Sequence, residues 1–210
     1  MNAALFSGQA IFQPTRWSLL KNPPSQEPVG LDEMKAWSRV DHADDDATIS
    51  GNVIAARRWV ETYTHRALVT QAFVYKIDRF PSSVTTVIAL PGGNTQSVTS
   101  IAYLDTDGNS QTWGASNYIA DLVSQPALVG LAYDIDWPSI REWDLPVTIT
   151  YSAAYGDDPG DVPEELRTAI KILAAELYES REETVVGSQI SAVPWGAKRL
   201  ADPYRIHRMI

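Results

Sequence analysis

Residues 161–180 read DVPEELRTAIKILAAELYES, and this stretch carries the clearest periodic pattern of the chain. Asp161, Pro163 and Glu164 form a helix start signal, because proline suits the first turn and acidic side chains favour the positive end of the helix dipole. Apolar side chains then recur on one helical face, at Leu166, Ile170, Leu173 and Leu177. The stretch predicts an amphipathic helix that ends near residues 180–183.

Two further helical patterns lie upstream, at about residues 31–40 and 45–64. Three aspartates, Asp44 to Asp46, precede the second of them and favour the helix dipole and a solvated face. The apolar faces of the two patterns comprise Leu31, Met34 and Trp37, and then Ile49, Val53, Ala56, Val60 and Tyr63. We expect the three helices to bury these faces against one another in an antiparallel core.

Between the second and third helices the pattern changes to short β-rich segments separated by turn residues. The segments are Leu68 to Ile77, Val84 to Leu90, Val98 to Leu104, Gln111 to Trp113, Tyr118 to Val123, Ala127 to Leu131 and Val147 to Tyr151. Asp107-Gly108 separates two of them, as in a tight hairpin. Six or seven short strands of this kind predict a small antiparallel sandwich or barrel.

The sequence therefore predicts an α+β fold in which an inserted β-domain (67–158) interrupts a three-helix core (31–66 and 160–183). Residues 1–30 contain four prolines and little periodicity, which predicts an extended N-terminal arm. Residues 184–210 contain Gly187, Pro194, Gly196 and Pro203, which argue against a long helix. We expect this segment to be a C-terminal docking tail that reaches out of the subunit.

The C-terminal segment is basic in an otherwise acidic chain. Residues 195–210 carry a charge of +3, whereas the whole chain carries −9 and the remainder −12. The candidate docking residues are Trp195, Lys198, Arg199, Tyr204, Arg205, Ile206 and Arg208. Such a segment fits an acidic partner groove or a nucleic acid, and we favour a protein partner because the remaining charge opposes a polyanion. In a third interpretation, Trp195 and Tyr204 pack on their own subunit.

Motifs for catalysis, cofactors or metals are absent from the sequence. There is no cysteine, and the three histidines are far apart and form no HxxxH or HExxH pair. No GxSxG, GxxxxGK[ST] or GxGxxG pattern occurs. We therefore expect no enzymatic activity, no cofactor and no metal. No apolar run approaches the roughly 18–20 residues that span a bilayer, and no signal peptide is evident.

One loop combines tryptophans and carboxylates. Trp137 and Trp143 are interspersed with Asp134, Asp136, Glu142 and Asp144. Two carboxylates and a stacking tryptophan are typical of a glycosidase or a carbohydrate-binding module. A surface loop pinned by its aromatic side chains is the simpler interpretation. An interface loop is a third, since tryptophan is favoured in interfaces.

A series of short motifs resembles the head–tail connector (adaptor) family of long-tailed bacteriophages and phage-like particles. The series covers about residues 31–205, and its order is more specific than any single piece. The pieces are LDEMKAWSRVD (31–41), DDD (44–46), AARRWVETYT (55–64), RALVTQ (66–71), LP (90–91), QSVTSI (96–101), YSAAYG (151–156), VP (162–163) and YESRE (178–182).

This resemblance implies a virion protein of the neck, assembled in the host cytoplasm. It implies a homo-oligomeric ring, typically of twelve copies, between the portal protein and a tail-terminator, stopper or other neck protein. DNA passes through such a ring without sequence-specific binding, and the family has no catalytic residues. We expect an acidic channel, and a C-terminal tail that docks on the portal or on an adjoining subunit. A different position in the neck, as a tail-completion protein, is the alternative.

Overall fold

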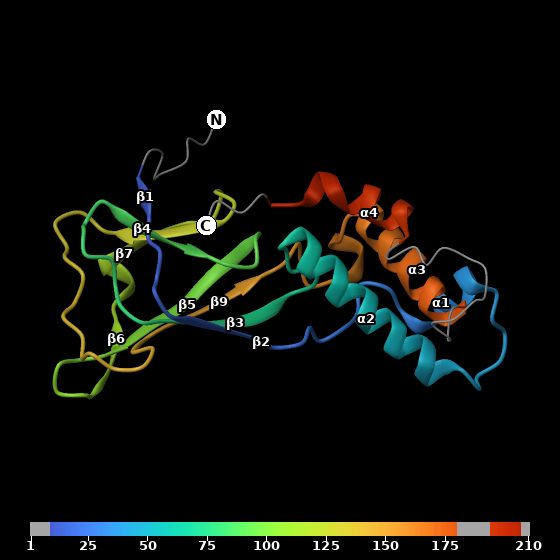
Figure 1. The fold of residues 1–210 in the computed structure, drawn as a ribbon, viewed down its shortest axis with the longest axis horizontal. Coiled ribbons are helices and arrows are strands. Elements are labelled where there is room, and N and C mark those ends of the chain that lie inside the picture. Colours follow the sequence, from blue (N-terminus) through green and yellow to red (C-terminus); the bar gives the residue numbers. More distant parts are fainter. Residues whose placement is uncertain (1–8, 180–193, 207–210) are drawn as a thin grey trace. The chain divides into compact units, whose positions relative to one another are not determined.

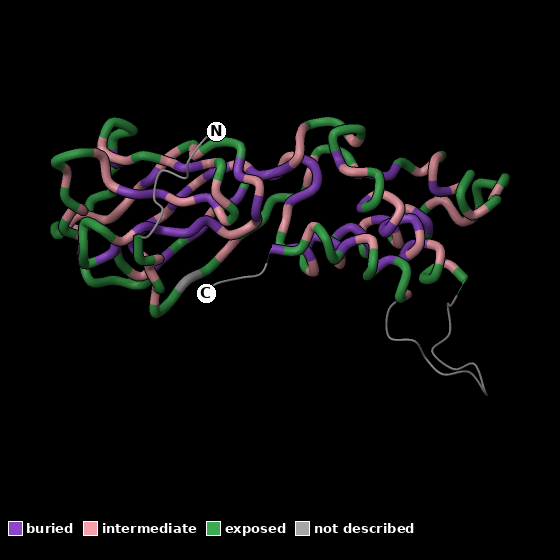
Figure 2. Tube along the Cα trace, turned by 90° about the horizontal axis from the view of Figure 1, so that it is seen from above, coloured by how far each residue is buried: buried purple, intermediate pink, exposed green. Residues whose placement is uncertain are grey.

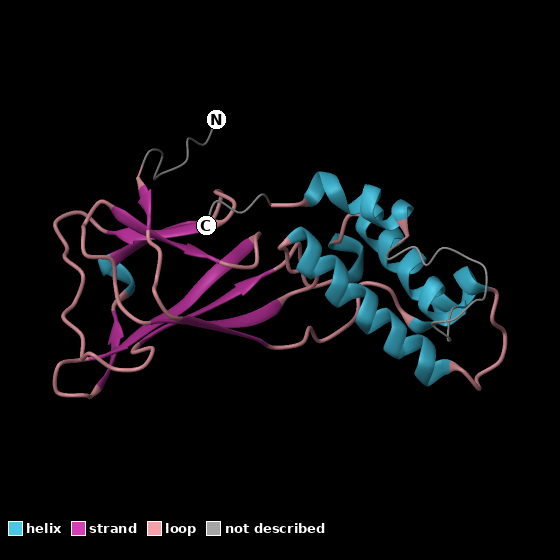
Figure 3. Cartoon of the chain, in the orientation of Figure 1, coloured by secondary structure: helices cyan, strands magenta, loops and turns pink. Residues whose placement is uncertain are grey.

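The computed structural model describes residues 9–179 and 194–206. The fold is mixed α+β, with four α-helices and two sheets in these residues (Figure 3). The chain divides into two compact units, each built from separate segments. Among the described residues, the β-unit consists of 9–24, 70–154 and 206, and the helical unit of 25–69, 155–179 and 194–205.

The helical unit is built on helix α3, which contacts the other three helices (Figure 1). The helices are α1 (Leu31–Ser38), α2 (Asp46–Thr64), α3 (Glu164–Glu179) and α4 (Trp195–Ala201). The core includes Met34, Ile49, Val53, Ala56, Val60, Leu166, Ile170 and Leu173, all positions that the periodic patterns select. Leu177 is an exception at 46% exposed, because the apolar period continues one turn beyond the core.

Local contacts explain where α1 ends and where α2 begins. Arg39 takes a left-handed conformation (φ 55°) after α1, and its N–H bonds the Ala36 carbonyl, which ends the helix. The predicted aspartate cluster lies at the start of α2. There Lys35 Nζ lies 2.6 Å from an oxygen of Asp46, and the Tyr178 hydroxyl donates to Asp45 at 2.5 Å. The aspartates thus connect α1 and α3 to the start of α2.

The larger sheet of the β-unit is antiparallel throughout, in the order β2-β3-β9-β5-β6. Its strands are β2 (Trp17–Lys21), β3 (Gln71–Ile77), β5 (Thr95–Leu104), β6 (Ser110–Trp113) and β9 (Val147–Ala153). Along β9 every second residue is buried, as expected for a strand with one face in the core. Figure 2 shows buried and less buried stretches alternating along the chain. Asp105 and Gly108 form the predicted turn between β5 and β6, where Gly108 has φ 91°.

The smaller sheet has the order β1-β4-β8-β7. Its strands are β1 (Ala10–Ile11), β4 (Thr86–Leu90), β7 (Tyr118–Asp121) and β8 (Ala127–Leu131). The pair β1–β4 is parallel, and the other two pairs are antiparallel. Trp113 of β6 stacks on Tyr118 of β7 with ring centroids 5.8 Å apart, so an aromatic contact joins the two sheets.

The N-terminal segment is extended but is not a free arm where the structure describes it. Strand β1 pairs with β4 in one sheet, and β2 pairs with β3 in the other. Residues 25–30 belong to the helical unit, where Val29 is buried. These strands are too short and too interrupted by proline to show a periodic pattern. Backbone hydrogen bonds to β3 and β4 hold them, and such bonds leave no mark in the residue sequence.

The C-terminal segment differs from the expected outward-reaching tail. Residues 195–201 form α4, which packs on α3 with Ala197 and Ala201 fully buried. Small side chains at this four-residue spacing let the helix approach the core closely. Pro194 precedes the first residue of the helix and Pro203 lies in the 3-10 turn after it. Prolines at these positions limit the helix to seven residues without preventing it.

Candidate docking surfaces

The exposed side of α4 carries cations and aromatic rings. We define the α4 surface as Trp195, Lys198, Arg199 and Arg205, together with Tyr63 of α2. The Arg199 guanidinium lies 5.0 Å from the centroid of the Trp195 ring. Arg205 and Lys198 lie 5.1 and 6.0 Å from the centroid of the Tyr63 ring. Each of these distances is within the range of cation–π attraction, so the rings orient the charges.

The helical period explains why this surface is exposed. Trp195 and Arg199 are four residues apart and share one side of α4, while Ala197 and Ala201 occupy the side that faces the core. Trp195 is 71% exposed. Among the described residues, neither Lys198 nor Arg199 forms an ion pair with a carboxylate. The surface therefore presents uncompensated positive charge beside an exposed indole.

One carboxylate close to this surface already has a partner. The Tyr63 hydroxyl donates a hydrogen bond to Asp202, and this bond raises the pKa of Tyr63. Tyr63 also stacks on Trp59, with ring centroids 4.9 Å apart. Sequence reasoning did not select Tyr63 or Trp59 for docking. The signal in the sequence was their i, i+4 spacing on α2, which places the two rings side by side on one face of the helix.

The remaining predicted docking residues have different surroundings. The Tyr204 hydroxyl donates to Glu165 at 2.9 Å, and Arg66 donates to the Tyr204 carbonyl at 2.5 Å. Tyr204 is thus packed on its own subunit, as the third interpretation of the tail expected for it, whereas Trp195 is not. Ile206 is buried at 9% exposed. Arg208 lies outside the described residues.

The two tryptophans of the candidate interface loop also differ. Trp137 belongs to an aromatic cluster, where its ring lies 5.1 Å from both Phe80 and Trp113. Its indole N–H donates to the Ser83 carbonyl at 3.3 Å. Trp143 is 64% exposed, with the Arg141 guanidinium 5.4 Å from its ring. Trp137 therefore pins the loop, and Trp143 is available for a partner.

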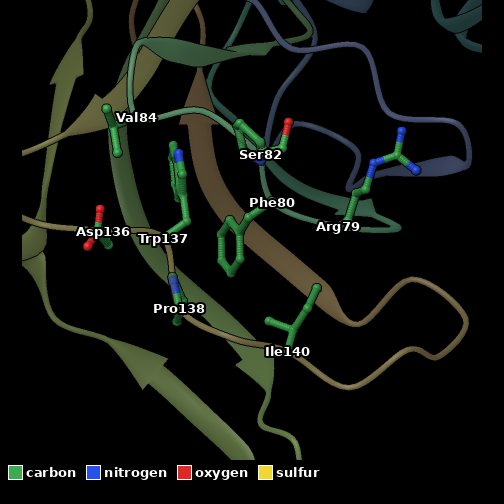
Figure 4. A pocket seen from close by; sticks show the side chains of 9 residues that line it. Arg79, Phe80, Ser82, Val84, Asp136, Trp137, Pro138 and Ile140 are labelled. Atoms are coloured by element: carbon green, nitrogen blue, oxygen red, sulfur yellow. The ribbon is translucent and has the colours of Figure 1, made fainter.

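A pocket of about 260 Å³ lies beside this cluster. Its lining comprises Arg79, Phe80, Pro81, Ser82, Val84, Asp136, Trp137, Pro138 and Ile140. Figure 4 shows Phe80 beside Trp137 and Ile140, with the Arg79 guanidinium pointing away from them. Asp136 is the single carboxylate in this lining. Asp144, another carboxylate of the loop, pairs instead with Arg16 at 2.7 Å. The pocket thus lacks the carboxylate pair that glycoside hydrolysis needs.

The described residues contain no group of three or more His, Cys, Asp or Glu side chains that could hold a metal ion. Nor does any helix within residues 9–179 and 194–206 have the length and apolar character needed to cross a membrane.

No protein-family model and no curated protein matches the sequence. Several solved structures match the fold. One is a chain in the neck of an empty gene transfer agent (GTA) particle computed with C6 symmetry. Its TM-score is 0.72 at 22% identity, over 91% of this chain and 97% of that chain. A chain in the virion of the native particle gives the same values.

A chain in the neck of the native GTA particle computed with C12 symmetry gives a TM-score of 0.66 at 21% identity, with the same coverage. At this level of identity the likeness concerns the fold, which extends over both units and nearly the whole of each neighbour. The chain therefore has the fold of these GTA neck and virion chains.

Proposed function

We propose that this chain is a structural subunit of a phage-type neck. It forms a ring between the portal and the tail or the next neck protein, and DNA passes through the centre of the ring. The observation that carries the proposal is the fold shared with GTA neck chains over 91% of the sequence. The motif series, which covers about residues 31–205, supports it independently, because it depends on the residues alone.

Twelve copies are the proposed number. The neck structures that share the fold have C6 and C12 symmetry, which agrees with a ring of this size. A ring needs two different lateral surfaces on each subunit, because a contact of this type closes only at one rotation. A second candidate is another position in the neck, as a tail-completion protein, since the fold likeness extends to neck and virion chains without fixing the position.

The C-terminal segment is the proposed docking element, on the portal or on an adjoining subunit. Its support is the exposed, uncompensated charge of Lys198 and Arg199 beside Trp195. Deleting residues 190–210 is not a clean test, because it would also remove Ala197 and Ala201 from the helical core. Substitutions on the exposed side of α4 leave that core intact.

The channel of the ring is proposed to be acidic. Outside residues 195–210 the chain carries −12, and a channel lined by such a protein attracts phosphate weakly or repels it. DNA would then slide through without being held. We propose that the subunit is made in the host cytoplasm and ends in the virion neck, with a tail-terminator or stopper on its far side.

Cryo-electron microscopy of the neck in an intact particle tests the proposal most directly. We expect density for this chain in a twelvefold ring next to the portal, with an acidic lumen. Finding the chain elsewhere in the particle would refute the adaptor position. A continuous basic lumen would refute the channel proposal alone, because the ring itself would remain.

A further inference from the structure

We infer that the α4 surface of one subunit binds the β8–β9 loop (residues 132–146) of the next copy in the ring. This inference rests on the proposed ring and names its lateral contact. Both surfaces belong to the same chain and lie in different units, the α4 surface in the helical unit and the loop in the β-unit. Each copy therefore offers its α4 surface to one neighbour in the ring and its β8–β9 loop to the other.

The β8–β9 loop is the acidic counterpart of the α4 surface. Asp134, Asp136 and Glu142 are exposed, and none of them forms an ion pair with a described residue. Two large aromatic side chains accompany them, since Tyr133 is 97% and Trp143 64% exposed. Tyrosine and tryptophan are enriched among the central residues of protein interfaces, and polar residues surround them at the rim.

The loop is held in place before any partner arrives. The Arg141 N–H donates to the Leu104 carbonyl at 3.1 Å, and Trp137 is packed against Phe80 and Trp113. In the other half of the contact, α4 is held against the helical core by its buried alanines, Ala197 and Ala201. Two ordered surfaces lose little conformational entropy on binding, so opposite charges and exposed rings contribute more of their energy to affinity.

A second copy is the occupant that accounts for both surfaces. DNA could bind Lys198 and Arg199, but it would not bind the acidic loop. It would therefore account for only one of the two surfaces. A contact between the two joins a basic surface carrying Trp195 to an acidic surface carrying Trp143. It is also heterologous, joining two different patches of identical subunits, which is the type of contact that closes a ring.

Zero-length cross-linking of the unaltered chain tests the contact. A carbodiimide joins a lysine amine to a carboxylate only when the two touch. Mixing ¹⁴N- and ¹⁵N-labelled chains before the reaction separates contacts between copies from contacts within one copy. We expect mixed-isotope peptides that join Lys198 to Asp134, Asp136 or Glu142. Joined peptides of a single isotope alone would overturn the inference, because they would place the contact within one chain.

Charge reversal provides the second test, read as the strength of self-association by analytical ultracentrifugation. We expect Lys198→Glu with Arg199→Glu to weaken self-association roughly tenfold or more. Asp136→Lys with Glu142→Lys should do the same. An equal mixture of the two double variants should recover association, because every contact in an alternating ring then joins opposite charges. The matched control is Arg58→Glu with Lys76→Glu, which reverses two exposed cations outside both surfaces.

The outcomes separate this inference from the proposed function. Rings that form normally in both double variants would overturn the lateral contact and leave the neck role standing. Loss of portal binding with normal rings would assign the α4 surface to the portal instead. A DNA mobility shift that disappears with Lys198→Glu and Arg199→Glu, without any change in self-association, would assign it to nucleic acid. A wild-type chain that never self-associates would count against both.

Discussion

The interiors of the two units differ in chemistry. In the helical unit, Arg57 is 3% exposed and contacts Glu27 at 2.6 Å and Glu61 at 2.9 Å. In the β-unit, the largest fully buried side chains are Phe73 and Tyr151, which stack with ring centroids 5.2 Å apart. The helical unit thus has ionic contacts in its core, where the β-unit has aromatic ones.

The difference reflects how each unit fixes its geometry. Strands are aligned by backbone hydrogen bonds, so their side chains need only fill space. Helices satisfy their backbone internally, and apolar faces alone permit several packing angles. Directional ion pairs select among these angles. Arg167 and Lys171 of α3 both contact Glu33 of α1, at 2.6 and 3.1 Å, and so fix α1 against α3.

The largest expected effect comes from removing the buried guanidinium. Arg57→Ala should destabilise the helical unit by about 3–5 kcal/mol, because it breaks the ion pairs that the buried guanidinium makes with Glu27 and Glu61. Hydrogen exchange measured by segment should show faster exchange in α2 than in β3. The control is Arg58→Ala, whose side chain is exposed and should cost no more than about 0.5 kcal/mol. An equal rise of hydrogen exchange in α2 and in β3 would contradict the contrast between the interiors of the two units.

A smaller effect is expected from overpacking the site of α4. Ala201 is fully buried, so Ala201→Leu should cost about 1–3 kcal/mol and loosen α4 from α3. Urea unfolding measures this loss of stability. Quenching of Trp195 fluorescence by acrylamide would not, because that side chain is already exposed in the wild type. Ala55→Leu, at an exposed position of α2, is the control. A stability unchanged from wild type would show that α4 is not packed as described.

In the β-unit, a single polar contact should matter less. The Tyr151 hydroxyl donates to the Pro91 carbonyl at 2.6 Å. Tyr151→Phe keeps the stacked ring and should cost about 1 kcal/mol, the usual contribution of one hydrogen bond. Tyr133→Phe, at a side chain that is 97% exposed, should leave the unfolding midpoint unchanged. A loss as large as that of Arg57→Ala would remove the contrast between the units.

The smallest effect concerns pH. A hydrogen bond from Lys171 holds the pKa of Glu164 below its ordinary value of 4.5. Its contribution to stability is therefore present above pH 4.5 and is lost as pH falls through the lower folded value. Glu164 is largely exposed, so the contribution should stay below about 1 kcal/mol. Urea midpoints of wild type and Glu164→Gln should converge on acidification, and a constant difference would exclude this role.

Periodicity predicted those parts of the fold in which one side of an element is buried. The faces of α2 and α3 follow from the spacing of apolar residues, and the strands from β3 to β9 follow from β-rich segments separated by turn residues. The sequence pattern did not predict strands β1 and β2 or helix α4. Backbone pairing holds these strands, and two buried alanines hold the helix. Alanine is common on exposed helix faces too, so Ala197 and Ala201 give no pattern in the sequence.

The candidate surfaces were predictable in composition but not in arrangement. The residues Trp195, Lys198 and Arg199 were selected as a basic aromatic segment, and they do share an exposed side. Tyr204 was selected by the same reasoning, yet it bonds Glu165 of α3. Whether a given aromatic side chain faces a partner or its own subunit depends on contacts between residues far apart in sequence, which one segment cannot reveal.

The order of the strands has a consequence for synthesis on the ribosome. Strand β9 lies between β3 and β5 in the larger sheet, although among the described residues it is the last strand to be translated. Until Val147–Ala153 emerges, β3 and β5 have no strand to join them. The larger sheet can therefore form in full only after the ribosome has made its central strand.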